Sequence, residues 1–281
     1  MQTFATARWF GGGTAAGRDH VAVEPAEIRD SWDANAPAWI ELSRAGFDVY
    51  RDLVNTPAFL ALLPPVEGLL GLDLGCGEGH NTRLLARAGA QLVALDISEP
   101  FLDAARAANR SGIRYALADG ADLPFPGESF DFVTAFMSVM EMGDPERALH
   151  EVGRVLKPGG FLQFSLVHPA TSTPIRRWVA DEGGRRAALT VGDYFYEGPL
   201  TETWTFGAAP PELRDRHPPF TITYARRTLA GWITAVLDAG LALEAVDEPR
   251  ADEETALARP EVADTRIAPY FLIMRARKPA R

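Results

Sequence analysis

The sequence predicts an α/β protein in which helices flank a parallel β-sheet. Two observations carry this prediction. From Gly68 onward short apolar runs alternate with helical patterns, and the first apolar run ends in a glycine-rich turn that leads into a helix. The 281 residues, 47% of them hydrophobic, can bury the core of one large domain, or of one domain with a cap.

The short apolar runs predict seven strands, and the segments between several of them carry helix signals. Strands are expected at 69–74, 91–95, 113–117, 130–135, 161–167, 241–246 and 270–277. Helices are expected at 81–88, 99–109, 145–156 and 229–239. Gly89 closes the first helix, Ser98 is a plausible N-cap of the second, and Asp144 caps the third with Pro145 as its first residue. A Lys-Pro-Gly-Gly run at 157–160 stops that third helix.

Two insertions interrupt this alternation. Segment 168–227 is rich in Pro, Trp and Tyr and is longer than an ordinary loop, and segment 247–268 is polar. Upstream, the apolar spacing in 27–63 suits two or three amphipathic helices that pack over one edge of the core. We therefore expect an N-terminal tail and helical lid over 1–63, a main domain over 64–281, and a cap insertion over about 168–227.

Charge and cysteine content narrow the class of protein. The net charge is −10, from 28 Lys and Arg against 38 Asp and Glu, which disfavours a general binder of nucleic acid. The single cysteine, Cys76, cannot form an intramolecular disulfide. No apolar run approaches the roughly 20 residues that span a bilayer, and residues 1–17 lack the pattern of a signal peptide. We expect a cytoplasmic protein that binds no membrane, with a loose or lid-like N-terminus.

The most informative run is Gly71-Leu72-Asp73-Leu74-Gly75-Cys76-Gly77-Glu78-Gly79-His80-Asn81. A strand that turns into a helix through three glycines lets a ligand approach the backbone and face the N–H groups of the helix N-terminus. A dinucleotide fingerprint would require a third glycine at position 80, where this chain has His80. A nicotinamide- or flavin-binding site is therefore disfavoured.

Two further carboxylates follow the next two predicted strands. Asp96 comes seventeen residues after Gly79, at the end of the second strand, where a carboxylate can accept hydrogen bonds from both hydroxyls of a ribose. Asp119 follows the third strand at the same edge of the sheet and could accept a hydrogen bond from the exocyclic amine of adenine. An ordinary turn or cap carboxylate is the alternative for Asp119.

With these motifs, residues 68–166 resemble the class I S-adenosylmethionine-dependent methyltransferases, in particular the type 11 small-molecule group that includes UbiE-like and BioC-like enzymes. The run 129–136 is similar to the family's fourth strand, and 154–160 to the helix end before its fifth. The resemblance implies a Rossmann-like sheet of order 3-2-1-4-5-7-6 with the seventh strand antiparallel. It also implies S-adenosylmethionine as cofactor, with S-adenosylhomocysteine as product, and a small-molecule acceptor.

The resemblance also assigns roles to residues around the glycine turn. The turn lies under the methionine part of the cofactor, Asp73 supports it, Asp96 holds the ribose, and Asp119 helps to frame the adenine. The full set that it implies for the cofactor is Asp73, Gly75, Cys76, Gly77, Asp96, Ile97, Asp119, Gly120, Ala121 and Phe136. For Cys76 a packing role is the alternative to a role in cofactor binding, because a small side chain there can simply fill space.

Methyl transfer from a sulfonium is an in-line displacement that favours a dry, aromatic pocket. The candidates for that pocket are Trp39, Tyr50, Met140, Tyr194, Tyr196 and Trp204, although aromatic residues can equally form the core of a cap. If the acceptor is a hydroxyl, His168 and Glu141 are the best-placed bases, and both have structural alternatives, a histidine bonded to backbone and a solvated acid. The histidines and the one cysteine have no metal-site spacing, so we expect no metal.

We therefore expect a monomeric or homodimeric methyltransferase that favours O- or C-methylation of a hydroxylated or carboxylated metabolite. Three alternatives stay open: an NAD(P)-dependent oxidoreductase, a non-catalytic protein that binds S-adenosylmethionine, and an RNA methyltransferase. The acidic balance disfavours the last of these.

Overall fold

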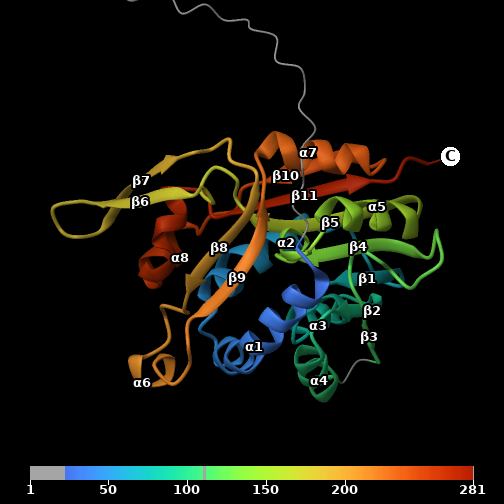
Figure 1. Cartoon of the computed structure of the whole chain (residues 1–281), viewed down its shortest axis with the longest axis horizontal. Coiled ribbons are helices and arrows are strands. Elements are labelled where there is room, and N and C mark those ends of the chain that lie inside the picture. The colour runs from blue at the N-terminus through green and yellow to red at the C-terminus, as the bar shows by residue number, and fades with distance from the viewer. Residues whose placement is uncertain (1–22, 110–111, 281) are drawn as a thin grey trace, which may run out of the picture.

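The computed structural model describes residues 23–109 and 112–280, and its centre is a seven-stranded sheet (Figure 1). The strand order is β10-β11-β5-β4-β1-β2-β3, and Figure 1 shows the strands in that order from top to bottom. The strands are β1 Leu70–Leu74, β2 Gln91–Asp96, β3 Arg114–Leu117, β4 Phe130–Phe136, β5 Leu156–Val167, β10 Ala242–Asp247 and β11 Phe271–Arg277. Only β11 runs antiparallel to its neighbours β5 and β10. This confirms the Rossmann-like order implied by the family resemblance.

Helices cover both faces of the sheet because successive strand residues point to opposite sides. In β4, Val133 packs in the cluster that joins the sheet to α5 and α7, and Phe132 packs in the cluster on the α3 side. The helices of this layer structure are α3 His80–Arg87, α4 Glu99–Ala108, α5 Pro145–Val155 and α7 Leu229–Asp238. The predicted helices are therefore all present, with ends that shift by one or two residues.

The helix ends follow the sequence signals in most cases. The Asp144 carboxylate accepts a hydrogen bond from the backbone N–H of Arg147 at 2.9 Å, and Gly89 ends the α3 segment with a φ of +88°. Ser98 occupies the N-cap position of α4 without a side-chain cap hydrogen bond. Helix α5 ends just before the 157–160 run, as the sequence predicts. The run itself belongs to β5, which begins earlier than predicted because Gly159 and Gly160 pair with the backbone of Lys278.

The insertion at 168–227 is ordered into two β-hairpins. The first hairpin pairs β6 Ile175–Ala180 with β7 Arg186–Gly192. The second pairs β8 Gly198–Trp204 with β9 Phe220–Arg226, and the short helix α6 Pro211–Arg214 lies in the connection between its two strands. Both hairpins lie on the left side of Figure 1, where β6 and β7 project furthest from the sheet. We call these hairpins, together with the N-terminal helices, the cap.

The N-terminal segment forms α1 Pro25–Arg44, the π-helix η1 Arg51–Asn55 and α2 Thr56–Leu62, in agreement with the two or three predicted helices. Helix α1 packs against β9 through Ala38, Leu42 and Phe220. The expectation of a loose N-terminus concerns residues 1–18, which lie outside the described residues.

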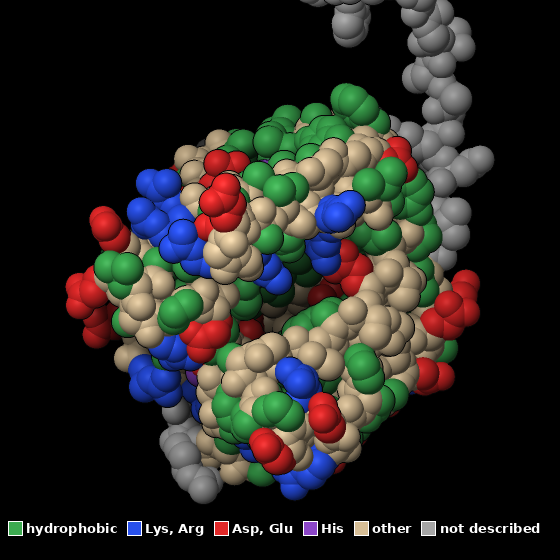
Figure 2. Space-filling model, turned by 90° about the vertical axis from the view of Figure 1, so that its left-hand side faces the viewer, with side chains coloured by type: hydrophobic (Ala, Val, Ile, Leu, Met, Phe, Trp, Pro, Cys, Tyr) green, Lys and Arg blue, Asp and Glu red, His purple; other side chains and the backbone are tan. Residues whose placement is uncertain are grey.

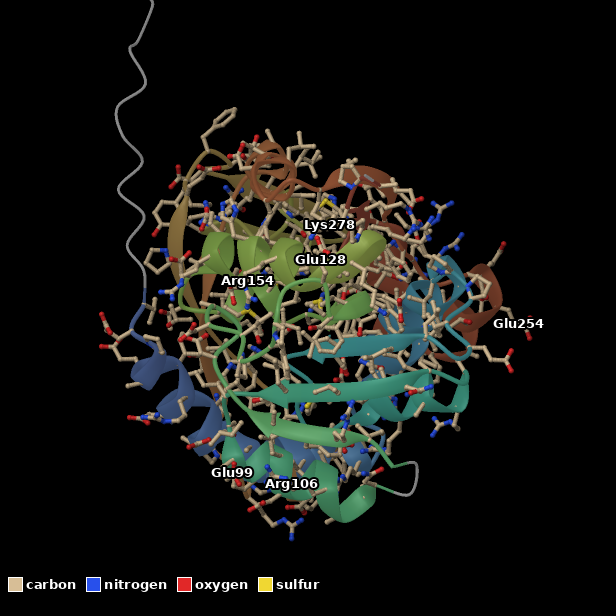
Figure 3. The ribbon with its side chains drawn as sticks, turned by 90° about the vertical axis from the view of Figure 1, so that its right-hand side faces the viewer. Glu99, Arg106, Glu128, Arg154, Glu254 and Lys278 are labelled. Atoms are coloured by element: carbon tan, nitrogen blue, oxygen red, sulfur yellow. The ribbon has the colours of Figure 1, made fainter. Side chains whose placement is uncertain are left out.

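The second insertion, 247–268, has an exposed acidic part and a buried part. It contains α8 Glu253–Ala258 and the 3-10 helix η3 Pro260–Arg266. The acidic side chains of α8 are exposed, and Glu254 points away from the body of the protein in Figure 3. In contrast, Val262, Asp264 and Thr265 of η3 are buried, so this insertion also contributes to the interior.

Candidate active site

The glycine turn after β1 is a left-handed backbone segment tied to the end of β2. Gly75, Gly77 and Gly79 have φ values of +71°, +54° and +80°, which favour glycine. The N–H groups of Gly75 and Cys76 both donate to the Leu95 carbonyl at 2.9 Å. A Cβ on Gly75 would lie 2.4 Å from Cβ of Ser138, whereas a Cβ on Gly77 would meet nothing within 4 Å. The turn is therefore packed from behind at Gly75 and open in front at Gly77.

Asp96 binds the turn from the neighbouring strand. Its carboxylate accepts hydrogen bonds from the Gly77 N–H at 2.7 Å and from the Ser98 N–H at 2.9 Å. Burial raises the pKa of Asp96 from 3.8 to about 6, against the lowering effect of these backbone hydrogen bonds. The carboxylate oxygens have capacity for further hydrogen bonds toward the cavity that they line.

Asp73 has a supporting position at the end of β1. It is almost fully buried, and both of its oxygens accept hydrogen bonds from hydroxyls, those of Thr82 and Thr134. Burial also raises the pKa of Asp73 to about 6. Because its oxygens are bound by residues of α3 and β4, Asp73 links these two elements beneath the turn.

Asp119 and Gly120 lie after β3 on the same side of the sheet. The Asp119 carboxylate accepts a hydrogen bond from the Ala121 N–H at 2.9 Å. A Cβ on Gly120 would lie 2.6 Å from Sδ of Met142, so a larger residue there would have to displace the end of the Met142 side chain. Ala121 is buried and does not line the cavity, in contrast to the other residues expected to contact the cofactor.

A cavity of about 1110 Å³ joins these residues to the cap. Figure 2 shows a hollow on the side of the molecule where the cap lies, with hydrophobic, arginine and acidic side chains around it. One wall contains Gly75, Cys76, Gly77, Asp96, Ile97, Asp119 and Phe136. The facing wall is aromatic and is formed by Trp32, Trp39, Phe47, Trp204 and Phe206. Burial raises the pKa of the Cys76 thiol well above its usual range, so Cys76 fills space as a neutral thiol.

The structure brings four of the six predicted pocket residues to this cavity. Trp39, Tyr50, Met140 and Trp204 line it, although they come from distant parts of the chain. Tyr194 and Tyr196 are not among the residues that line it.

Both of these tyrosines serve the packing of the cap. The Tyr194 hydroxyl accepts a hydrogen bond from the Leu229 N–H at 3.1 Å, and the Tyr194 ring lies against the Arg226 guanidinium. The Tyr196 hydroxyl donates to the Pro199 carbonyl at 2.7 Å. Their hydroxyls therefore hold backbone of the cap and of the following helix.

His168 also does not line the cavity, and its expected role as a base does not fit its surroundings. It is 4% exposed, its Nε2 lies 2.8 Å from Glu248, and its Nδ1 accepts a hydrogen bond from the Ala170 N–H. Both ring nitrogens are thus used to hold the chain after β5. This is the structural alternative that the sequence left open.

Glu141 is the predicted base that does line the cavity. Burial raises the pKa of its carboxyl well above the ordinary value, and the nearby charge of Asp96 adds to that shift. A carboxylate whose conjugate acid has a raised pKa is a stronger base than an ordinary carboxylate. Glu141 is therefore better suited to proton transfer than an ordinary exposed acid.

Sequence reasoning missed a polar cluster on the cap side of the cavity. We call Tyr50, Arg186, Asp264 and Tyr270 the Asp264 cluster. The Tyr50 hydroxyl lies 3.0 Å from both Asp264 oxygens, the Tyr270 hydroxyl donates to Oδ2 at 2.8 Å, and Arg186 forms an ion pair with Oδ2. The segment around Asp264 has the composition of a solvated loop, so no local signal could have found it.

Two kinds of feature are absent from residues 23–109 and 112–280, a group of metal ligands and a membrane-spanning helix. Within these ranges, no three His, Cys, Asp or Glu side chains are grouped so as to hold a metal ion. None of the helices described there has the length and apolar character needed to cross a membrane.

Comparisons with known proteins agree with this geometry. Residues 72–164 match a family model described as a methyltransferase domain. Among solved structures, the chain is similar to an S-adenosylmethionine dependent methyltransferase from Mesorhizobium loti, with 33% identity and a TM-score of 0.66 over 79% of this chain and 96% of that one.

Two curated proteins match over shorter regions. The chain is 40% identical over 162 residues to a demethylmenaquinone methyltransferase from Tropheryma whipplei, covering 55% of this chain and 63% of the relative. It is 33% identical over 143 residues to a malonyl-[acyl-carrier protein] O-methyltransferase from Pectobacterium atrosepticum, covering 50% and 56%. The chain thus spans less than two thirds of the length of these curated relatives.

Proposed function

The chain belongs to the S-adenosylmethionine-dependent methyltransferases, and on that basis we propose that it transfers a methyl group from S-adenosylmethionine to a small organic acceptor. The observation that carries the proposal is the cavity itself. One wall contains the glycine turn and Asp96, and the opposite wall is aromatic. A donor and an acceptor can therefore be held face to face in one enclosed space.

The residues present fit the cofactor. Gly77 leaves open space where a side chain would stand, and this lets the aminocarboxylate part approach the backbone. Asp96 has carboxylate oxygens available for the ribose hydroxyls, and Asp119 with Gly120 and Ile97 borders the space for the adenine. Asp73 acts indirectly, by fixing the turn through Thr82 and Thr134.

The chain contributes position and a dry environment to the reaction. S-adenosylmethionine, when bound, supplies an electrophilic methyl group on a sulfonium. The cap aromatics around Trp39 and Trp204 exclude water and confine the acceptor, and alignment of reacting atoms at about 3 to 3.5 Å can supply much of the acceleration. Glu141 is the group that would receive the proton of a hydroxyl acceptor.

We further propose an oxygen or carbon atom of a hydroxylated or carboxylated metabolite as the methyl acceptor. Glu141 at the cavity supports a proton transfer of this kind. We place the protein in the cytoplasm as a monomer or homodimer that does not act on membranes. Its net charge of −10 disfavours nucleic acid as a substrate. These assignments concern the whole protein and are open to direct tests.

Calorimetry with S-adenosylhomocysteine and with NAD separates methyl transfer from the oxidoreductase alternative. We expect heat of binding from the first compound and none from the second. Incubation with methyl-labelled cofactor and a metabolite extract then separates an enzyme from a non-catalytic binding protein, because only an enzyme yields a labelled small product. Glu141→Gln should lower turnover while cofactor affinity changes little; equal turnover would remove Glu141 from the mechanism.

A further inference from the structure

We propose that the Asp264 cluster recognises a hydroxyl or amine group on a flat, uncharged acceptor. This inference rests on the proposed function and specifies its substrate class. Tyr50, Arg186, Asp264 and Tyr270 all line the same cavity as the glycine turn, but they come from three separate segments of the chain, since Asp264 and Tyr270 are six residues apart. Their convergence on one buried carboxylate, far from the glycine turn in sequence, marks a second polar site in the cavity.

The hydrogen-bonding capacity of Asp264 defines what the site can bind. Oδ2 accepts from Tyr50, Tyr270 and Arg186, whereas Oδ1 accepts only from Tyr50 among the described residues. A carboxylate offers about four lone-pair sites, so Oδ1 can accept one more hydrogen bond. The Tyr50 oxygen donates to Asp264 and can itself accept. The free capacity therefore calls for a donor on the ligand, either O–H or N–H.

Of the two acceptor classes proposed above, the charges around the cavity favour the hydroxylated over the carboxylated one. Each arginine that lines the cavity already has a carboxylate partner: Arg51 with Asp52, Arg176 with Glu202, Arg185 with Asp181 and Arg186 with Asp264. In contrast, Asp73, Asp96, Asp119 and Glu141 have no arginine or lysine within 4.0 Å in the described residues. A carboxylate ligand would thus enter a region of negative charge without a free cation to meet it.

Aromatic rings border the space beside this polar site. Tyr50 and Tyr270 are stacked with ring centroids 5.0 Å apart. Trp39 and Trp204 meet edge to face at 5.4 Å on the cap wall. Flat apolar surfaces of this kind favour a planar ligand body. The polar site and these rings together select a planar molecule with one hydrogen-bond donor.

Three naphthalene probes test this class on the full chain saturated with S-adenosylhomocysteine. They are 2-naphthol, its methyl ether 2-methoxynaphthalene, and 2-naphthoate, compared by ligand-observed NMR titration. We expect 2-naphthol to bind about threefold to tenfold more tightly than either of the others, the scale of one hydrogen bond. Equal binding of 2-naphthol and the methyl ether overturns the proposal, as does the absence of 2-naphthol binding.

Variants connect the preference to the cluster. Asp264→Asn should reduce the preference for 2-naphthol, and Tyr50→Phe should increase it because Oδ1 then has no other donor, while the affinity for S-adenosylhomocysteine stays unchanged in both. Glu261→Gln is the matched control, because Glu261 lies on the same 3-10 helix and lines the cavity but makes no contact with the cluster. Tyr50→Phe keeps the test decisive if Asp264→Asn fails to fold. A preference that is unchanged in the folded variants overturns the proposal, whereas a wild-type protein that binds no S-adenosylhomocysteine overturns the proposed function instead.

Discussion

The two walls of the cavity are built in different ways. The wall with the glycine turn comes from one continuous region, in which β1, β2, β3 and β4 end at the same edge of the sheet. The cap wall comes from α1 and η1, from the two hairpins, and from η3 near the end of the chain. The first wall depends on local backbone geometry, and the second depends on contacts between distant segments.

The hydrogen bonds on the two walls show the same difference. Asp96 is held by backbone N–H groups at Gly77, in the adjacent turn, and at Ser98, two residues further along its own chain. Asp264 is held by Tyr50 and Arg186, which are 214 and 78 residues away in sequence. Changes on the turn side should therefore disturb both the fold and cofactor binding, and changes on the cap side should act on the acceptor.

Gly75→Ala should have the largest effect. The new Cβ would lie 2.4 Å from Ser138 and the residue would keep a φ of +71°, so overpacking and backbone strain together should lower the free energy of unfolding by about 2 to 5 kcal/mol. Chemical denaturation measures this change. We also expect the variant to lose detectable binding of S-adenosylhomocysteine.

Gly77→Ala is the matched control for that experiment. It has a φ of +54° and open space around a new Cβ, so it carries backbone strain alone, about 1 to 2 kcal/mol. We still expect weaker cofactor binding, because the methyl group would occupy the space in front of the turn. Equal destabilisation by the two substitutions would contradict the packing that we assign to Gly75.

Asp96→Ala should have the next largest effect, and it should act mainly on binding. Removing the carboxylate leaves the Gly77 and Ser98 N–H groups and the ribose hydroxyls without a partner, which should weaken cofactor binding by about 1 to 3 kcal/mol. Calorimetry with S-adenosylhomocysteine measures the loss. Asp122→Ala serves as control, since Asp122 is an exposed acid after β3. Unchanged affinity in Asp96→Ala would remove Asp96 from the cofactor site.

The pH dependence of binding should show an effect of several-fold. In the ligand-free protein the pKa of Asp96 is about 6, so the carboxylate takes up a proton as the pH falls through 6 and becomes a poorer acceptor. Affinity for S-adenosylhomocysteine should therefore be constant above about pH 7 and fall below pH 6. Asp96→Asn should flatten this profile, and an unchanged slope in that variant would assign it to another group.

Stability of the ligand-free protein should change in the opposite direction. The folded-state pKa values of Asp73 and Asp96 lie above the ordinary value of 3.8, so ionisation of these buried groups costs stability as the pH rises from about 4 to about 6. Their contribution to the free energy of unfolding should therefore increase on acidification through that window. Denaturation at pH 7 and pH 5, in wild type and in Asp96→Asn, measures the difference.

The sequence predicts the turn wall well because its signals are local. Alternating apolar runs place the strands, and left-handed glycines with a carboxylate at the next strand end place Asp96 beside Gly77. The cap wall has no such signal. Tyr194, Tyr196 and Trp204 are all aromatic residues of one insertion, but only Trp204 lines the cavity: it is paired in β8, whereas Tyr194 and Tyr196 lie in the loop between β7 and β8, where no strand periodicity sets their side. His168 fails for a related reason, since its partner Glu248 is distant in sequence.

Arg44→Ala should give the smallest effect, and it tests whether the two walls act separately. Arg44 at the end of α1 donates to Glu78 at 3.0 Å and to the Ala104 carbonyl at 2.9 Å, so it joins the cap to the glycine turn. The Arg44 side chain is 40% exposed, and an ion pair of that kind contributes about 0.5 to 1 kcal/mol.

We expect S-adenosylhomocysteine to dissociate about twofold to fivefold faster from Arg44→Ala, because α1 opens more easily over the bound ligand. Stopped-flow fluorescence can follow release, since Trp32 and Trp39 line the cavity. Arg29→Ala is the control on the same helix, where the arginine pairs only with its neighbour Asp30 among the described residues. An unchanged rate would mean that the turn holds the cofactor without help from α1. A loss larger than that of Asp96→Ala would mean that the cap wall holds the cofactor as well as the acceptor.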